Sequence, residues 1–144
     1  MFTSVAIIGR PNVGKSSLFN KLTKSRDAIV SDFPGLTKDR NYGFLNLDDN
    51  KILIIDTGGI VNESDNLKEA ISNQAWSAVE ESSFIILMLD SSENLTKDDL
   101  DILHKLRKLN KDYVIVLNKV DKKTDSLIKN DLQKEGIHSA IEIS

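Results

Sequence analysis

The loop that governs the architecture of this chain reads Gly9-Arg10-Pro11-Asn12-Val13-Gly14-Lys15-Ser16-Ser17. It matches the phosphate-binding loop pattern, in which a glycine and four further residues precede Gly-Lys-Ser. The two glycines allow backbone N–H groups to turn toward phosphate oxygens. Lys15 supplies a cation for the terminal phosphates, and the Ser16 hydroxyl supplies a ligand for the accompanying Mg²⁺. The pattern predicts a loop that binds a nucleotide.

The residues on either side have the character that such a loop requires. Ser4–Ile8 is a short apolar run typical of a buried strand, and Ser17–Leu22 opens a helix whose N-terminal dipole faces a bound anion. The alternative is a glycine-bearing turn with a chance Lys-Ser pair. A strand before the loop and a helix after it argue against that alternative.

The composition of the 144 residues is that of one globular domain, with 40% hydrophobic and 28% charged residues. The net charge of −3 argues against a non-specific nucleic-acid binder, which needs a concentrated basic face. The absence of cysteine excludes disulfides and thiolate metal sites. His104 and His138 stand alone, so neither is expected to bind a metal or to act in catalysis. No apolar run is long enough to span a membrane and no signal peptide is evident, so we expect a cytoplasmic protein.

Five continuous apolar runs recur along the chain: Val5–Ile8, Ile52–Ile55, Phe84–Leu89, Tyr113–Leu117 and Ala140–Ile143. Such runs predict parallel strands that are covered on both faces, with ligands bound beyond their carboxyl ends. The segment Asn41–Leu47 is joined to the second run by an Asp-Asp-Asn turn, which predicts an antiparallel edge strand. We therefore expect an α/β fold of the P-loop NTPase class, with helices on both faces of a mostly parallel sheet.

Three further helices are predicted, from about Leu67 to Glu80, from an N-cap at Thr96, and from about Thr124 to Glu135. Trp76 lies off the apolar stripe of the first of these helices. We favour a residue that is half-covered by a neighbouring loop, and the alternative is an anchor for another domain.

A second group of candidate ligands, Asp56-Thr57-Gly58-Gly59-Ile60, follows the run Ile52–Ile55. Asp56 can hold Mg²⁺ through water, and the N–H of Gly59 can bind a terminal phosphate. Asp-x-x-Gly by itself is common in turns. Its position between a phosphate loop and the motif described next makes it informative.

The base is indicated by Asn118-Lys119-Val120-Asp121, which ends the run Tyr113–Leu117. The Asp121 carboxylate can accept two hydrogen bonds from the N1–H and 2-amino groups of guanine, which adenine does not offer. Asn118 can tie this segment to the phosphate loop, and the stem of Lys119 can lie along the base. The motif predicts GTP or GDP as the ligand, against the alternative of a polar turn that only closes a strand.

Together these motifs resemble the first GTPase domain of the Der (EngA) family, which has the Ras-like G-domain fold. The resemblance covers essentially the whole chain and rests on Gly9–Leu22, Asp56–Ile60 and the segment Ser31-Asp32-Phe33-Pro34-Gly35-Leu36-Thr37-Lys38-Asp39-Arg40. Gly58 separates the chain from Era-like proteins, which usually have proline there. The second Der domain and the tRNA-modifying MnmE usually have alanine.

The resemblance implies a bacterial GTPase that acts in maturation of the large (50S) ribosomal subunit, which would be a partner of the full-length protein. It also implies that Asp56–Ile60 begins the second switch. Thr37 of the first switch would close on Mg²⁺ when GTP is bound. The expected metal ligands are therefore Ser16, Thr37 and Asp56.

The chain departs from Ras-like enzymes at Ile60, which stands where they carry a catalytic glutamine, as it does in the Der-like family. In related GTPases the asparagine that corresponds to Asn12 helps to bind K⁺ against the phosphates, and such a cation can neutralise developing charge. We expect K⁺-stimulated hydrolysis with Lys15, Asn12, Thr37 and Gly59 as catalytic residues. The alternative is that Asn12 only braces the loop through its side-chain amide.

The last residues, Ile141–Ser144, resemble the strand that leads into the final guanine-contacting motif, of which Ser144 is the first residue. The closing helix, second GTPase domain and KH-like domain of the family are absent from the sequence. We therefore expect residues 1–144 to be a single GTPase domain of a longer, multidomain chain. No direct nucleic-acid site is evident in these residues.

Two other functions compete with a GTP-hydrolysing switch. A phosphate-loop kinase shares the loop but has no reason to carry the residues Asn118–Asp121, and it would bind ATP more tightly than GTP. A nucleotide-binding regulatory module with negligible turnover is suggested by Ile60. Measurement of turnover separates this module from the GTPase.

Overall fold

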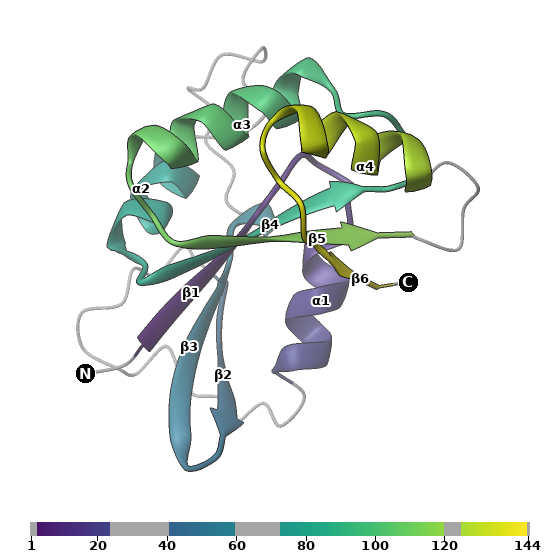
Figure 1. Cartoon of the computed structure of the whole chain (residues 1–144). Coiled ribbons are helices and arrows are strands. Elements are labelled where there is room, and N and C mark those ends of the chain that lie inside the picture. Colours follow the sequence, from purple (N-terminus) through teal and green to yellow (C-terminus); the bar gives the residue numbers. More distant parts are fainter. Residues whose placement is uncertain (1–2, 24–40, 60–72, 120–124, 144) are drawn as a thin grey trace.

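The computed structural model describes residues 3–23, 41–59, 73–119 and 125–143 (Figure 1). Strands and helices alternate along most of the chain. In order they are β1 (Thr3–Ile8), α1 (Lys15–Leu22), β2 (Asn41–Leu47), β3 (Asn50–Asp56), the 3₁₀ turn η2 (Thr57–Gly59), α2 (Asn73–Glu81), β4 (Phe84–Asp90), α3 (Lys97–Lys108), β5 (Tyr113–Asn118), α4 (Asp125–Lys134) and β6 (Ile141–Glu142).

The strands form one six-stranded sheet in the order β2-β3-β1-β4-β5-β6. Only the pairing of β2 with β3 is antiparallel among the described strands, and β2 lies at the edge, as predicted. The register aligns the ends of parallel strands, because Ile7 lies opposite Asp56 and Asp90 lies opposite Asn118. Polar groups from three strands therefore meet at the edge where β1 runs into the phosphate loop. This confirms the predicted fold class.

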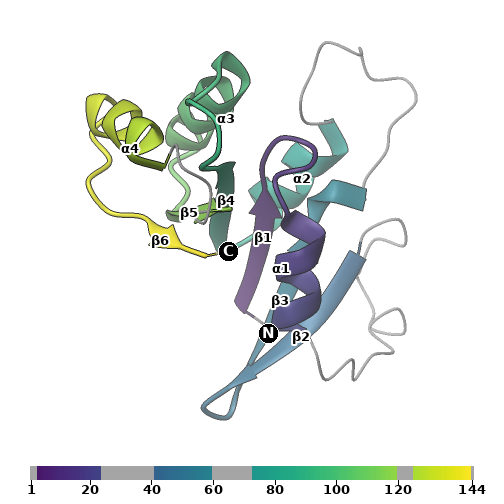
Figure 2. The same ribbon diagram turned by 90° about the vertical axis from the view of Figure 1, so that its right-hand side faces the viewer.

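Helices cover both faces of the sheet, as expected. Alternate residues of β1 pack in opposite directions: Ala6 and Ile8 belong to the cluster with α2, α3 and α4, and Val5 and Ile7 belong to the cluster with α1. Figure 2 shows the loop between β1 and α1 at the upper end of both elements, with α3 and α4 to one side. The loop is thus placed between the two helical layers.

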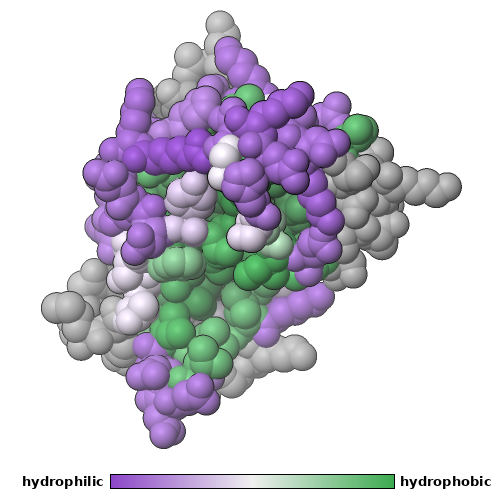
Figure 3. Space-filling model, viewed as in Figure 1, coloured by the Kyte–Doolittle hydropathy of each residue, from purple (hydrophilic) through white to green (hydrophobic). Residues whose placement is uncertain are grey.

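The α1 face of the sheet is less completely covered than the other face. Nine apolar residues that pack against its cluster are only partly buried, among them Phe84, Ile86, Val114 and Ile143. Figure 3 shows apolar side chains gathered in the middle of the molecule, with polar residues above and below them. Among the described helices only α1 contributes to this cluster, and its eight residues are too few to cover six strands.

Trp76 overturns both sequence-based interpretations of its environment. Its exposed fraction is 8%, and it belongs to the cluster that α2 forms with α3 and the sheet. The ammonium of Lys105 on α3 lies 4.5 Å from the centroid of its ring. The apolar stripe of α2 did not reveal this because α3, which is distant in sequence, widens the buried face.

The start of α3 and the end of α4 agree with the capping residues that the sequence indicated. Thr96 caps α3, and Gly136 follows α4 in the left-handed region with a φ of 82°. The predicted core residues Leu67 and Ile71 lie outside the described residues. None of the helices in the described part of the chain combines the length and apolar character that crossing a bilayer requires.

Candidate nucleotide-binding site

The two glycines of the phosphate loop are required by close packing. A Cβ at Gly9 would lie 2.6 Å from the Met88 carbonyl oxygen. Gly14 has a φ of 107°, and a Cβ there would lie 2.1 Å from Nδ2 of Asn118. The loop backbone therefore passes against β4 and the end of β5 where a side chain does not fit.

Lys15 begins α1 and turns back onto the loop. Its side chain is buried, and Nζ donates to the carbonyl oxygens of Gly9 and Arg10, each at 2.7 Å. Burial lowers its pKa to about 8, although the nearby Asp56 carboxylate acts in the opposite direction. The cation is thus held at the centre of the loop, where terminal phosphates are expected to bind.

Arg10 reaches away from the loop to the start of α3. Its Nε donates to Oδ1 of Asp99 at 2.7 Å, and its Nη2 donates to Oε2 of Glu93 at 2.9 Å. Burial tends to lower the pKa of Arg10, but its hydrogen bonds with Asp99 and Glu93 outweigh burial and raise it. Sequence analysis placed Arg10 among the nucleotide-binding residues. In the structure its backbone remains in the loop, whereas its side chain binds two carboxylates.

The second half of the loop is held by residues at the end of β5. Asn118 Nδ2 donates to the Val13 carbonyl oxygen at 2.8 Å, which confirms the predicted tie. Lys119 Nζ donates to the Asn12 carbonyl oxygen at 3.2 Å and to Oδ2 of Asp90 at 3.0 Å. The segment that carries the predicted guanine-binding motif is therefore bonded directly to the phosphate loop.

Asp90 supports this arrangement from the end of β4. Burial tends to raise its pKa, but hydrogen bonds from Ser92 and Lys119 outweigh burial and hold the pKa below its ordinary value. Ser91 adds a hydrogen bond of 2.7 Å from its hydroxyl to the Asn118 carbonyl oxygen. Asp90 is therefore a charged partner that positions Lys119.

The predicted metal ligand Asp56 lies at the end of β3 beside Lys15. It is 1% exposed, and its Oδ1 accepts from the N–H of Gly58 at 2.9 Å. A Cβ at Gly58 would lie 3.0 Å from Cε of Lys15 and 3.2 Å from Oδ1 of Asp56. The Thr57 hydroxyl donates to the Ile7 carbonyl oxygen at 2.7 Å, so it holds the strand end in place.

Several predicted residues contribute in different ways. Ser16 and Ser17 are exposed at the start of α1, as are Pro11 and Asn12 in the loop, so these side chains are accessible to a ligand. Val13 is buried in the α1-side cluster, so its side chain belongs to the core. Five predicted site residues lie outside the described residues, and their roles stay predictions: Thr37, Ile60, Val120, Asp121 and Ser144.

Within the described ranges no group of three histidine or acidic side chains is placed to hold a metal ion. This does not conflict with Mg²⁺, which keeps waters and phosphate oxygens and needs only one or two protein ligands. Ser16 and Asp56 provide a hydroxyl and a carboxylate, which are oxygen donors of the type that Mg²⁺ prefers.

Sequence reasoning missed Glu93 and Asp99 as parts of this region. A Thr-x-x-Asp capping pattern at Thr96 was readable in the sequence. The pairing of Asp99 with Arg10 was not, because 89 positions separate the two residues and no local pattern joins them.

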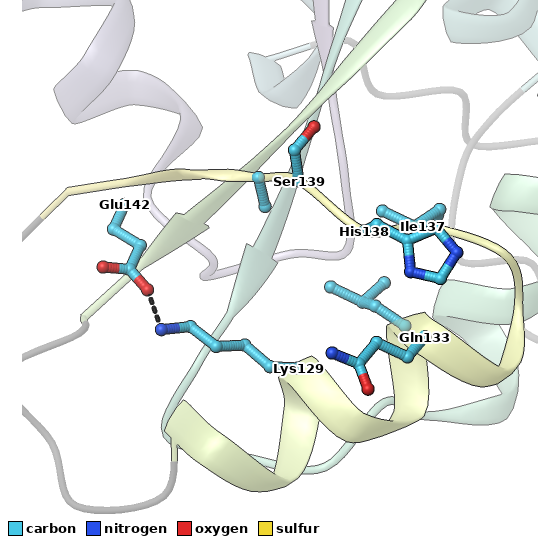
Figure 4. A pocket seen from close by; sticks show the side chains of 8 residues that line it. Lys129, Gln133, Ile137, His138, Ser139 and Glu142 are labelled. Carbon is cyan, nitrogen blue, oxygen red and sulfur yellow. Dashed lines mark ion pairs between the residues drawn. The ribbon is translucent and has the colours of Figure 1, made fainter.

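A surface pocket of about 270 Å³ lies between α4 and the segment that leads into β6 (Figure 4). Its lining includes the apolar residues Leu132 and Ile137 together with Lys129 and Glu142, which form an ion pair with each other. None of its lining residues is a predicted nucleotide-binding residue. It is separate from the phosphate loop.

Comparison with known proteins agrees with this geometry. A family model described as 50S ribosome-binding GTPase matches residues 4–119. The protein GTPase Der of Idiomarina loihiensis is 47% identical over 121 residues, which are 84% of this chain and 25% of the relative. The GTPase Der of Stenotrophomonas maltophilia is 41% identical over 145 residues, 100% of this chain and 31% of the relative. The chain thus spans about a quarter to a third of the length of these curated relatives.

Two solved structures of Era share the fold. An Era variant of Aquifex aeolicus bound to GDP·AlF4⁻ has a TM-score of 0.74 and 31% identity, covering 98% of this chain and 50% of that one. Era in complex with MgGDPNP and nucleotides 1506–1542 of 16S ribosomal RNA has a TM-score of 0.73 and 32% identity, covering 99% and 50%. Identity is higher to the two Der relatives than to these Era chains.

Proposed function

This chain belongs to the family of 50S ribosome-binding GTPases, and we propose that it is a GTP-binding and GTP-hydrolysing switch domain of a Der (EngA)-like factor. The observation that carries the proposal is the phosphate loop with buried Lys15 at its centre, tied through Val13 to Asn118 of the guanine-binding motif. Era chains about 31–32% identical to this one are bound to GDP·AlF4⁻ and MgGDPNP, which supports a guanine nucleotide as the ligand.

Recognition of guanine is assigned to Asp121, whose carboxylate would pair with the N1–H and 2-amino groups of the base. The positions of Asn118 and Lys119 support this, because both are bonded to loop carbonyl oxygens next to the expected phosphate site. Ser144 is proposed as a further contact near the base. A phosphate-loop kinase remains the competing enzyme, and it predicts tighter binding of ATP than of GTP.

Mg²⁺ would be held by Ser16, by Thr37 and, through water, by Asp56. Buried Asp56 beside Lys15 and exposed Ser16 at the start of α1 fit this donor set. When bound, the ion neutralises charge on the phosphate oxygens. Lys15 and the backbone N–H groups of the loop orient the same phosphates, and the N–H of Gly59 would bind the terminal one.

Hydrolysis is proposed to depend on K⁺, because Ile60 offers no group that could orient water. Asn12 is the candidate ligand of this ion. Its side chain is exposed, its φ is 69°, and its side-chain amide makes no hydrogen bond to the described residues. That environment favours a ligand role over a bracing role in the loop.

The test is single-turnover GTP hydrolysis with Mg²⁺ in K⁺ and in Na⁺ at equal ionic strength, for the wild type and for Asn12→Ala. We expect stimulation by K⁺ that is lost in the variant. Equal rates in both salts would remove K⁺ from the mechanism. Rates near background with intact GTP binding would favour the regulatory module, and tighter binding of ATP than of GTP would favour the kinase.

A cytoplasmic role in assembly of the large (50S) ribosomal subunit is part of the proposal, and the family description, 50S ribosome-binding GTPase, supports a link to that subunit. We propose that ribosome contact is made by the full-length protein, with a second GTPase domain and a KH-like domain outside these residues. Depletion of the full-length protein should then lower the ratio of mature large subunits to small subunits in a sucrose gradient, and an unchanged ratio would contradict this role.

A further inference from the structure

We propose that Asp99 is a positioning residue for the phosphate loop and acts through Arg10. The buried carboxylate at the start of α3 fixes the guanidinium, and thereby fixes the part of the loop backbone that holds Lys15. The inference rests on the proposed function, because the loop is taken to bind the phosphates of a nucleotide. It adds a restraint from α3, which carries none of the predicted nucleotide-binding motifs.

Asp99 is a rigid support. Its side chain is 1% exposed and uses both carboxylate oxygens: Oδ1 accepts from Arg10, and Oδ2 accepts from the backbone N–H of Thr96 at 3.0 Å. The Thr96 hydroxyl in turn accepts from the N–H of Asp99 at 3.1 Å, which completes a capping box. The carboxylate cannot rotate without losing one of these bonds.

The helix behind Asp99 is anchored in the core. Ile102, Leu103 and Leu106 of α3 are buried in the cluster shared with α2, α4 and the sheet. The carboxylate is also favoured electrostatically at the N-terminus of a helix. Arg10 is therefore bonded to a fixed point of the molecule.

The guanidinium is held in one orientation. Its planar fork binds Asp99 through Nε and Glu93 through Nη2, so two of its edges are used, and its side chain is 18% exposed. Glu93 is 52% exposed at its side chain, so water weakens its share of the restraint. Asp99 is the stronger of the two partners.

The restraint reaches the nucleotide site through the backbone of Arg10. The carbonyl oxygen of Arg10 accepts from Lys15 Nζ at 2.7 Å, so this one residue joins α3 at its side chain and the catalytic lysine at its carbonyl. A loop already held in this shape loses less conformational entropy when a phosphate binds. Release of a bound nucleotide should therefore become faster when the link between Arg10 and Asp99 is removed.

The kinetic experiment measures dissociation of a fluorescent GDP analogue from the 144-residue chain. It compares the wild type with Arg10→Gln, Asp99→Asn and the double variant, and Asp98→Asn is the matched control because Asp98 is an exposed acid in the same first turn of α3. We expect each of the two link variants to release GDP about tenfold faster, and the double variant no faster than either. Asp98→Asn should behave as wild type.

Two results would overturn the inference. A wild-type rate in Arg10→Gln, with a faster rate in Asp99→Asn, would mean that Asp99 only caps α3. Multiplied effects in the double variant, about a hundredfold in total, would mean that the two residues act separately.

A second measurement does not depend on nucleotide binding. Amide hydrogen exchange of the nucleotide-free chain should be about tenfold faster at residues 9 and 10 in Arg10→Gln, with unchanged protection along α3 and wild-type helix content by circular dichroism. Unchanged exchange at residues 9 and 10 would overturn the positioning role. If the wild type failed to bind GDP, the proposed function would fail, and the exchange result would still decide the inference.

Discussion

The first half of the phosphate loop is held by charged side chains near the start of α3, whereas its second half is held through backbone carbonyls by residues at the end of β5. Arg10 binds the carboxylates of Asp99 and Glu93. The carbonyls of Asn12 and Val13 accept from Lys119 and Asn118. The second restraint comes from the motif that is proposed to bind guanine, so base and phosphate recognition would share one support under the proposed function. The first comes from a helix without a nucleotide-binding motif.

The largest effect is expected at Gly14, in the second half of the phosphate loop, because a side chain does not fit there. Gly14→Ala would place a Cβ 2.1 Å from Nδ2 of Asn118 at a φ of 107°, so it would break the bond between Asn118 and Val13 and strain the loop. We expect GDP affinity, measured by isothermal titration calorimetry, to fall at least about a hundredfold.

Gly136→Ala is the matched control, because Gly136 also has a positive φ, of 82°, but nothing lies within 4 Å of its Cβ position. It should lower the free energy of unfolding by about 1 kcal/mol and leave GDP affinity within about twofold of wild type. Equal losses of GDP affinity in the two variants would show that the packing around Gly14 is not decisive.

A smaller effect is expected when the second half loses one hydrogen bond without a clash. Asn118→Ala removes the donor to the Val13 carbonyl oxygen, and we expect GDP affinity to fall about tenfold. Asn46→Ala, at an exposed asparagine of β2, is the control and should bind GDP as the wild type does. Wild-type affinity in Asn118→Ala would show that Lys119 alone can hold this half.

The cation of Lys15, which is bonded to two carbonyl oxygens of the first half, should make GDP binding depend on pH. The pKa of Lys15 is about 8 without nucleotide, and a bound phosphate raises it, so binding above pH 8 takes up a proton. The dissociation constant of GDP should therefore increase about fourfold between pH 7 and pH 8.5. Lys15→Arg keeps its charge in this range and should lose the dependence, and a flat profile for the wild type would contradict the lowered pKa.

Raising the pH should weaken GDP binding through Lys15, but in the nucleotide-free chain the same lysine should make the folded state more stable as the pH rises. Its folded-state pKa of about 8 lies below the ordinary value of 10.5, so the unfolded chain binds more protons between these values. The contribution of Lys15 to the free energy of unfolding therefore increases as the pH rises from about 8 toward 10.5. Urea titrations of the wild type and Lys15→Met at several pH values measure this contribution.

The smallest effect is expected at Glu93, the more exposed of the two carboxylates that bind Arg10. Glu93→Gln removes a charge from a side chain that is 52% exposed, while Asp99 keeps its bond to Arg10. GDP dissociation should change by less than about twofold. A tenfold change would place the main restraint at Glu93 and contradict the ranking of the two carboxylates.

Much of this structure could be read from local patterns. The strand Asn41–Leu47 has the bounds that the hairpin signal predicted, and Thr96 caps α3 as its sequence indicated. The tie between Asn118 and the loop also followed from motif chemistry. By contrast, Ala140–Ile143 was predicted as a strand of which only Ile141–Glu142 forms, because strand ends depend on the neighbouring strand.

The amino-acid sequence was sufficient for the strand–loop–helix order, the cation Lys15 and the order of the motifs along a parallel sheet, because each depends on spacing over a few residues. Tertiary structure alone decided that Trp76 is buried under α3 and that Arg10 turns toward Asp99. Both outcomes depend on contacts between segments that are distant in the sequence, and a local sequence pattern does not identify the partner in such a contact. It also does not reveal that the contact is shielded from water, which makes a polar contact stronger.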